Sequence, residues 1–212
     1  MMMATWFILF ILAIIIYSIF EKGIRSLSWE MLTSVPQGGY YYGRGGGILN
    51  AILGSLALAF GATVLAFVIG LPVALYLNVF LIRHKKVINV VRFLLDLVWG
   101  VPSIVYGAFG FSLMILMGLQ TSLLAGILTV TLFILPIMIR SMDEILTTVP
   151  IGLQEAAYSI GSNKSEIAFK IFTRQTVSGI ITAVLLSFGR GIGDAAAVLF
   201  TAGYTDHLPN GL

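Results

Sequence analysis

Cysteine is absent from the 212-residue sequence. This absence excludes a disulfide framework, a thiolate metal site and a cysteine nucleophile, and it leaves the cellular compartment undecided. Histidine is scarce as well, since only His84 and His207 occur, and neither has a second ligand at metal-binding spacing. We therefore expect no metal site and no cofactor in this chain.

Charged residues are also few. They make up 10% of the chain, against about 25% in soluble domains, whereas 58% of the residues are hydrophobic and the mean hydropathy is +1.02. Because a hydrocarbon core about 30 Å thick needs roughly 20 apolar residues per helix, the length fits about five or six spans and no sizeable soluble domain. The net charge of +3 comes from scattered basic residues, not from a stripe that would bind nucleic acid.

Stretches without charge mark the candidate membrane segments, which are residues 4–20, 45–82 and 97–139. The last is twice as long as one span, so it predicts a helical hairpin with its break at residues 118–121. A further span is expected over residues 171–202. Residues 1–20 are interpreted as an uncleaved first span, since no basic start or small-residue cleavage site indicates a signal peptide. The sequence thus predicts five spans.

Basic residues in the connecting loops predict the orientation. Eight of them lie between spans two and three or around the segment between spans four and five: Arg83, Lys85, Lys86, Arg92, Arg140, Lys164, Lys170 and Arg174. Such residues are retained in the cytoplasm, so the amino terminus is expected there and the carboxyl end outside. Residues 21–47 then form an extracytoplasmic loop rich in glycine and tyrosine. This loop has no P-loop pattern, so any ATP must be hydrolysed by a partner.

Residues 150–166 predict a helix, a turn and a second helix on the cytoplasmic side. Pro150 disfavours helix at the preceding residue. An apolar stripe at helical spacing follows, formed by Leu153, Ala156, Ala157 and Ile160. Gly161 suits the left-handed position that closes a helix, and Asn163 with Glu166 has capping-box spacing. The first helix either rests on the bilayer surface or inserts into a protein groove, and its small alanines favour the groove.

The same segment resembles the coupling motif of permease subunits of ATP-binding-cassette (ABC) importers. Glu155-Ala156-Ala157 is followed after three residues by Gly161 and after nine more by Ile171. The motif usually continues with any residue, Leu and Pro, whereas Phe172-Thr173-Arg174 stands here. The resemblance implies that an ATPase subunit is contacted by Leu153, Glu155, Ala156, Ala157, Ile160 and Gly161.

Three further segments, at residues 100–107, 135–140 and 189–195, resemble the phosphate branch of the MetI-like permease family. The resemblance implies an all-α, polytopic transmembrane helical bundle with residues 48–204 as the permease core. It implies a multi-pass protein of a bacterial or archaeal cytoplasmic (inner) membrane that imports inorganic phosphate and is not itself an enzyme. The implied partners are an ATPase dimer that uses ATP, a second homologous permease subunit and an extracytoplasmic phosphate-binding protein.

Two features depart from that branch. The family usually has Glu where Asp194 stands, and it has a further span beyond this carboxyl end, so we expect a truncated chain that lacks the final span and ends in an outside segment at residues 205–212. Alternatives are a permease for another oxyanion, such as sulfate or molybdate, and a transport-incompetent membrane scaffold. A membrane-embedded enzyme would need Asp194, Asp96 or Glu155 as acid or base, but no paired acids or nucleophile–base set supports it.

Arg190 and Asp194 fall inside the predicted fifth span. Each costs about 2.5–3.5 kcal/mol at a span centre, so both should face a protein or water-filled interior. The resemblance implies a role in phosphate passage, in which Arg190 attracts the oxyanion and Asp194 keeps it from being trapped. The alternative is a local ion pair at i and i+4.

Arg140 and three prolines complete the candidate path. Arg140 is interpreted either as a second anion station or as an ordinary positive-inside anchor. Pro72, Pro102 and Pro136 lie within spans, where each removes a backbone hydrogen bond. These prolines either bend helices to open a cavity or are packing features only.

Overall fold

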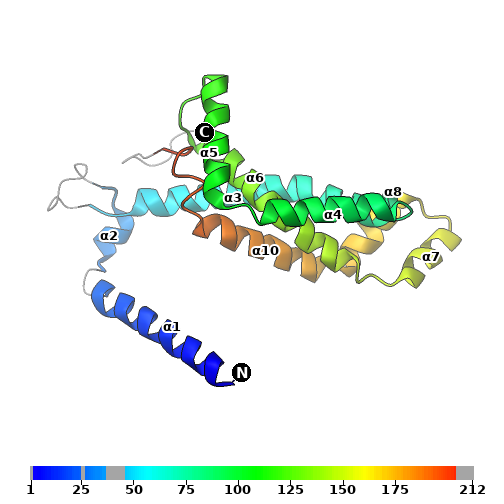
Figure 1. The fold of residues 1–212 in the computed structure, drawn as a ribbon, viewed down its shortest axis with the longest axis horizontal. Coiled ribbons are helices and arrows are strands. Elements are labelled where there is room, and N and C mark those ends of the chain that lie inside the picture. The colour runs from blue at the N-terminus through cyan, green and yellow to red at the C-terminus, as the bar shows by residue number, and fades with distance from the viewer. Residues whose placement is uncertain (1, 25–26, 37–45, 204–212) are drawn as a thin grey trace. The chain divides into compact units, whose positions relative to one another are not determined.

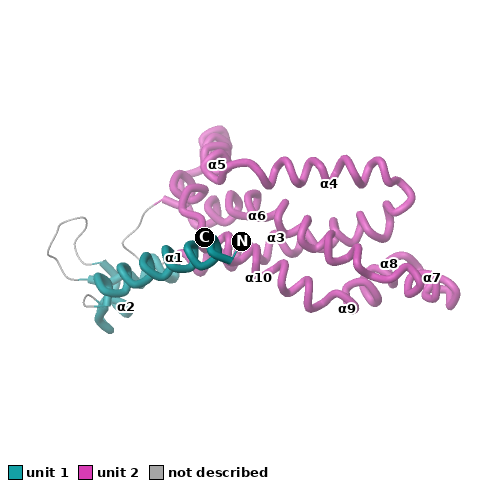
Figure 2. The backbone as a smooth tube through the Cα atoms, turned by 60° about the horizontal axis from the view of Figure 1, so that its bottom comes forward, with its two compact units in different colours: residues 1–53, 205–208 teal, residues 54–204, 209–212 magenta. Residues whose placement is uncertain are grey.

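The structure is a computed structural model that describes residues 2–24, 27–36 and 46–203. All regular secondary structure in these ranges is helical (Figure 1). The chain divides into two compact units at Leu53 and Gly54, which are drawn in teal and magenta in Figure 2. The predicted all-α fold is therefore confirmed.

The first unit contains helix α1 (Met2–Gly23) and the short helix α2 (Trp29–Thr33). Ser28 caps α2 by accepting a hydrogen bond from the Met31 amide over 3.1 Å. No residue of α1 is buried, although the helix is almost entirely apolar. An almost entirely apolar helix suits hydrocarbon rather than water, and α1 is long enough to cross a membrane.

Helix α6 (Leu123–Leu146) is the centre of the second unit. It contacts α4 (Lys85–Trp99), α5 (Ser103–Met117) and α10 (Val177–Gly193). Two thirds of its most apolar window is buried, whereas none of α1 is. The core around it also takes small side chains from α3 (Leu49–Leu75), such as Ala62 and Ala66, which let the helices approach closely.

Among the described residues, three helical segments are long and apolar enough to cross a membrane: α1, α3 continued by the π-helix η1 (Tyr76–Phe80), and α6. Two bent pairs qualify only when each pair is taken as one span, which would raise the number to five. One pair is α4 with α5, and the other runs from residues 164–175 into α10. The predicted hairpin break is confirmed, since α5 ends at Met117, Gly118 has a φ of +67°, and α6 begins at Leu123.

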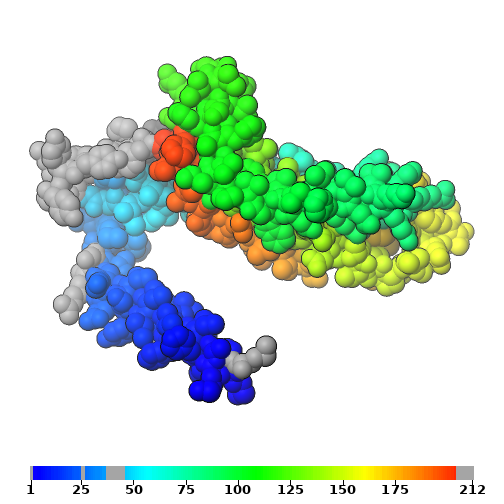
Figure 3. All heavy atoms as spheres, viewed as in Figure 1, coloured from blue at the N-terminus to red at the C-terminus, as the bar shows by residue number. Residues whose placement is uncertain are grey.

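The basic segment expected to be a loop between spans two and three is instead the first half of α4. The prediction was wrong because α4 is amphipathic, and Ile88 is buried at i+3 from Lys85 and i−4 from Arg92, on the helix face that these two basic residues share. Helix α5 turns by 93° from α4 and projects from the second unit (Figure 3).

Pro102 explains the bend between α4 and α5. It has no N–H to donate to the Val98 carbonyl, which instead accepts hydrogen bonds from the Tyr106 hydroxyl over 2.8 Å and from the Val101 amide over 3.2 Å. By contrast, Pro72 and Pro136 lie within the continuous helices α3 and α6. One proline of the three therefore coincides with a sharp bend.

The last predicted span is not continuous over residues 171–202. The chain runs through α8 (Lys164–Glu166), the π-helix η2 (Ile167–Phe172) and α9 (Thr173–Gln175), then bends by 77° into α10. Helix α10 ends at Gly193 because glycines weaken its last turns and Asp194 Oδ2 accepts a hydrogen bond from the Ala197 amide over 2.9 Å. Turns follow as far as Ala202.

Candidate functional site

The segment between α6 and α10 has the predicted helix–turn–helix structure. Helix α7 (Ile151–Ser159) is closed by Gly161, whose φ is +86°. The Ser162 amide donates to the Ala157 carbonyl over 3.0 Å, which completes the closing turn. The capping box is present as well, since the Glu166 amide donates to Asn163 Oδ1 over 2.8 Å and the Asn163 amide donates to Glu166 Oε2 over 3.1 Å.

Helix α7 has a packed face and an open face. Gln154 and Ala157 are buried against the rest of the second unit. Leu153, Ala156 and Ile160 point outward, and Ile160 is 84% exposed. The predicted apolar stripe is therefore wrong at one position, because Ala157 faces inward with Gln154 three residues before it. The remaining three positions form an exposed apolar strip. Helix α7 itself lies at one end of the second unit (Figure 1).

Arg190 and Asp194 do not form an ion pair with each other. Arg190 lies in the last turn of α10, is exposed, and has its guanidinium carbon 5.0 Å from the ring centre of Phe133. Asp194 lies one residue beyond the helix and accepts from the Ala197 amide. Within the described ranges Arg190 has no hydrogen bond, so all of its N–H donors are available to a ligand.

Arg140 is engaged by two carboxylates. Its Nε donates to Asp96 Oδ1 over 2.8 Å, and its Nη1 donates to Asp143 Oδ2 over 3.1 Å. Both acids lie within the same unit, on α4 and α6. An arginine whose charge is matched in this way attracts a further anion less strongly than one without acidic partners.

Asp143 is the centre of this cluster, and the sequence did not predict it. Its side chain is fully buried. It accepts hydrogen bonds from Asn78 Nδ2 at 2.8 Å, from Arg92 at 2.7 and 2.9 Å, and from Arg140 at 3.1 Å. An acid near the end of an apolar helix, three residues after an arginine and followed by Glu144, was the available signal. Its distant partners on η1 and α4 could not be read from spacing.

Comparison with known proteins identifies the family. Residues 66–210 match the family described as "Binding-protein-dependent transport system inner membrane component". The chain belongs to this family. It is therefore a multi-pass inner-membrane permease component and not an enzyme, and ATP hydrolysis belongs to an ATPase partner. Membership also implies a solute-binding protein as a partner.

Curated relatives of this permease share most of its length. The chain is 36% identical to the phosphate transport system permease protein PstA of Pasteurella multocida over 94% of its own residues and 70% of that protein. For the protein of the same name from Haemophilus influenzae, the identity is 35% over 92% of this chain and 67% of the relative. The counterpart from Yersinia pestis is 36% identical over 94% and 67%.

A solved structure of the MetNI methionine ABC transporter in an inward-facing conformation shares the permease fold. The TM-score is 0.66, with 24% sequence identity, over 74% of this chain and 75% of the other. This likeness supports the fold alone. It agrees with the MetI-like helical bundle expected from the sequence.

Proposed function

We propose that this chain is the permease subunit of an ABC importer that moves inorganic phosphate into the cytoplasm. The observation that carries the proposal is the agreement among the relatives, three of which are phosphate permeases at 35–36% identity over 92–94% of this chain. Membership of the family supports the class of transporter, and the names of the relatives support phosphate as the solute.

In this proposal the cytoplasmic side carries residues 150–166, and the ATPase contacts the open face of α7. The exposed strip of Leu153, Ala156 and Ile160 supports this role, because an apolar strip at a helix surface is stabilised when a protein groove covers it. Glu155 lies on the exposed side as well, and Gly161 sets the turn. Ala157 acts from the inner face by packing α7 against the unit.

The proposed complex contains two ATPase subunits, a second homologous permease subunit and an extracytoplasmic phosphate-binding protein. Spans two to five of this chain line half of the path, and the second permease lines the other half. ATP-driven movement of α7 then shifts the spans between outward and inward access.

Arg190 is proposed as the main anion station of the path. Phe133 supports one face of the guanidinium, and the unpaired N–H donors match the oxygens of phosphate. Asp194 sits one turn further along and keeps the arginine from retaining the anion. Arg140 is a weaker second station, because two carboxylates already offset its charge.

Phosphate uptake by membrane vesicles that carry the complete transporter tests the proposal. Arg190→Gln should lose most phosphate uptake, because the amide keeps only part of the donor set and no charge. The matched control is Arg174→Gln, which alters an exposed arginine outside the proposed path and should transport normally. Normal uptake by Arg190→Gln with intact ATP hydrolysis would contradict the station. The alternative solute is tested with labelled sulfate or molybdate. Uptake of either anion that unlabelled phosphate does not inhibit would indicate a permease for that anion.

A further inference from the structure

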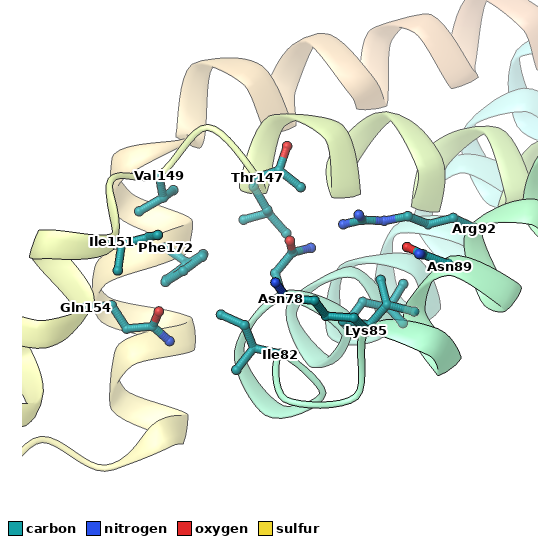
Figure 4. Close-up of a pocket in the computed structure, with 13 residues that line it drawn as sticks. Asn78, Ile82, Lys85, Asn89, Arg92, Thr147, Val149, Ile151, Gln154 and Phe172 are labelled. Atoms are coloured by element: carbon teal, nitrogen blue, oxygen red, sulfur yellow. The ribbon is translucent and has the colours of Figure 1, made fainter.

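A cavity of about 320 Å³, lined by both apolar and polar side chains, lies beside α7 on its packed side. It is bordered by α7, the end of α6, η1, η2 and the start of α4 (Figure 4). Its polar lining consists of Asn78, Lys85, Asn89, Arg92, Thr147 and Gln154. No Asp or Glu belongs to its lining. The volume exceeds that of a phosphate group with several waters, each of which occupies about 30 Å³.

Gln154 is a largely buried residue whose amide opens onto the cavity. It is 7% exposed, and it makes no hydrogen bond within the described ranges. Figure 4 shows its side chain extending from α7 into the space opposite Lys85. The fully buried side-chain atoms without a hydrogen-bond partner in the described residues are Thr63 Oγ1 and Ser187 Oγ, so the Gln154 amide is accessible from the cavity. Its donors and its acceptor are therefore free to bind an occupant with hydrogen-bonding atoms.

The charge of the cavity is positive. Arg92 is matched by Asp143, and the cluster of Arg92, Arg140, Asp96 and Asp143 contains two cations and two anions. Lys85 has no ion pair in the part of the chain that the structure describes. It is also the first residue of α4, which begins without a side-chain cap. An uncapped helix start adds partial positive charge near the lysine.

Asn78 has an acceptor that a protonated anion could use. Its Nδ2 donates to the Ala74 carbonyl over 2.9 Å and to Asp143 Oδ1 over 2.8 Å. Both amide hydrogens are thus in use, and the carbonyl oxygen remains as an acceptor. Phosphate keeps a proton near neutral pH and can donate to this oxygen, whereas sulfate has no proton to donate.

We infer that the cavity binds a phosphate group, as inorganic phosphate or a lipid headgroup, between Lys85 on α4 and Gln154 on α7. The occupant would join the proposed ATPase-coupling helix to the start of α4. This binding does not depend on which solute the permease carries, so it stands if the proposed transport substrate is wrong.

The test is lysine acetylation of the complete complex, purified in a maltoside detergent without nucleotide and quantified by peptide mass spectrometry. Inorganic phosphate should reduce acetylation of Lys85 several-fold and leave Lys86 unchanged. Lys86 is the matched control, since it is the next residue, is exposed, and does not line the cavity. Sulfate at equal ionic strength should protect Lys85 less than phosphate does.

A variant and a second ligand sharpen the result. Gln154→Leu should raise the phosphate concentration for half-protection roughly fivefold or more, because one hydrogen bond is lost. A soluble short-chain phosphatidic acid tests the lipid source, and protection by it alone would assign the site to a headgroup. The inference is overturned if neither phosphate nor this lipid protects Lys85 in the wild-type complex. It is also overturned if Lys86 is protected from acetylation as strongly as Lys85. The wild-type comparison decides this even if Gln154→Leu fails to assemble.

Discussion

The Arg92 guanidinium donates two hydrogen bonds to the Asp143 carboxylate, from Nε to Oδ2 over 2.7 Å and from Nη2 to Oδ1 over 2.9 Å. The residues are 51 positions apart and lie on α4 and α6. This bidentate pair fixes the first half of α4 to the end of α6. The chain enters α7 a few residues later, so the pair also positions the segment proposed to contact the ATPase.

Asp143→Asn should destabilise the permease by about 3 kcal/mol, because loss of the buried carboxylate charge leaves Arg92 without its acidic partner and Arg140 with Asp96 alone. Breaking a buried ion pair usually destabilises a protein by about 3–5 kcal/mol. The lower end of that range applies here, since the side chains of Arg92 and Arg140 are 28% and 25% exposed. Denaturation of the purified complex in detergent measures this. Glu144→Gln, at an exposed neighbouring acid, should unfold like the wild type. Equal stability of both variants would show that the pair does not hold α4 to α6.

Gly107→Ala should destabilise the second unit by about 1–3 kcal/mol. A Cβ there would lie 2.8 Å from the Ala196 carbonyl oxygen and 3.0 Å from that of Ala197, and backbone atoms cannot move aside like a side-chain tip. Gly54→Ala is the control, because a Cβ there meets nothing within 4 Å. Thermal unfolding of the two variants gives the comparison, and a Gly107→Ala protein as stable as Gly54→Ala would refute this packing.

Gly161→Ala should lower the free energy of unfolding by about 1 kcal/mol, since a φ of +86° is unfavourable for any residue with a Cβ. No atom lies within 4 Å of the added methyl, so the cost is purely conformational. Gly152→Ala lies within α7, also meets no neighbour, and should instead stabilise the helix by about 0.5–1 kcal/mol. Opposite signs are expected in unfolding measurements. A destabilised Gly152→Ala would contradict the helical assignment of α7.

Phe133→Leu should weaken phosphate transport without lowering basal ATP hydrolysis. The ring lies 5.0 Å from the Arg190 guanidinium carbon, and a cation–π contact contributes about 0.5–2 kcal/mol. The KM for phosphate should therefore rise about twofold to thirtyfold in vesicles, whereas Phe133→Tyr should keep most of the effect of the ring. An unchanged KM in Phe133→Leu would show that the ring does not position Arg190.

Local signals in the sequence were sufficient for the segments that depend on near neighbours. The left-handed glycines at 118 and 161 and the box of Asn163 and Glu166 act within a few residues, so their positions indicated the hairpin break and the helix–turn–helix. Composition predicted membrane-spanning segments, and the resemblance to importer permeases implied the all-α bundle. These features need no knowledge of distant contacts.

Features that depend on distant contacts were missed. Helix α4 was interpreted as a basic loop because charge was weighed above amphipathic spacing. The cluster at Asp143 joins residues 51 and 65 positions apart, which no spacing rule connects. The end of α10 was placed too late, because the bond from the Ala197 amide to Asp194 competes with helix at a site where apolar content alone favours continuation.

Crosslinking from α7 tests the central claim most directly. This chain has no cysteine, so Ile160→Cys places one reactive group on the open face of α7. A thiol-specific crosslinker should join it to the ATPase subunit in the working complex, whereas Leu185→Cys, exposed on α10, should not be joined. Capture of only lipid or detergent by Ile160→Cys, in a complex that still transports, would contradict the account.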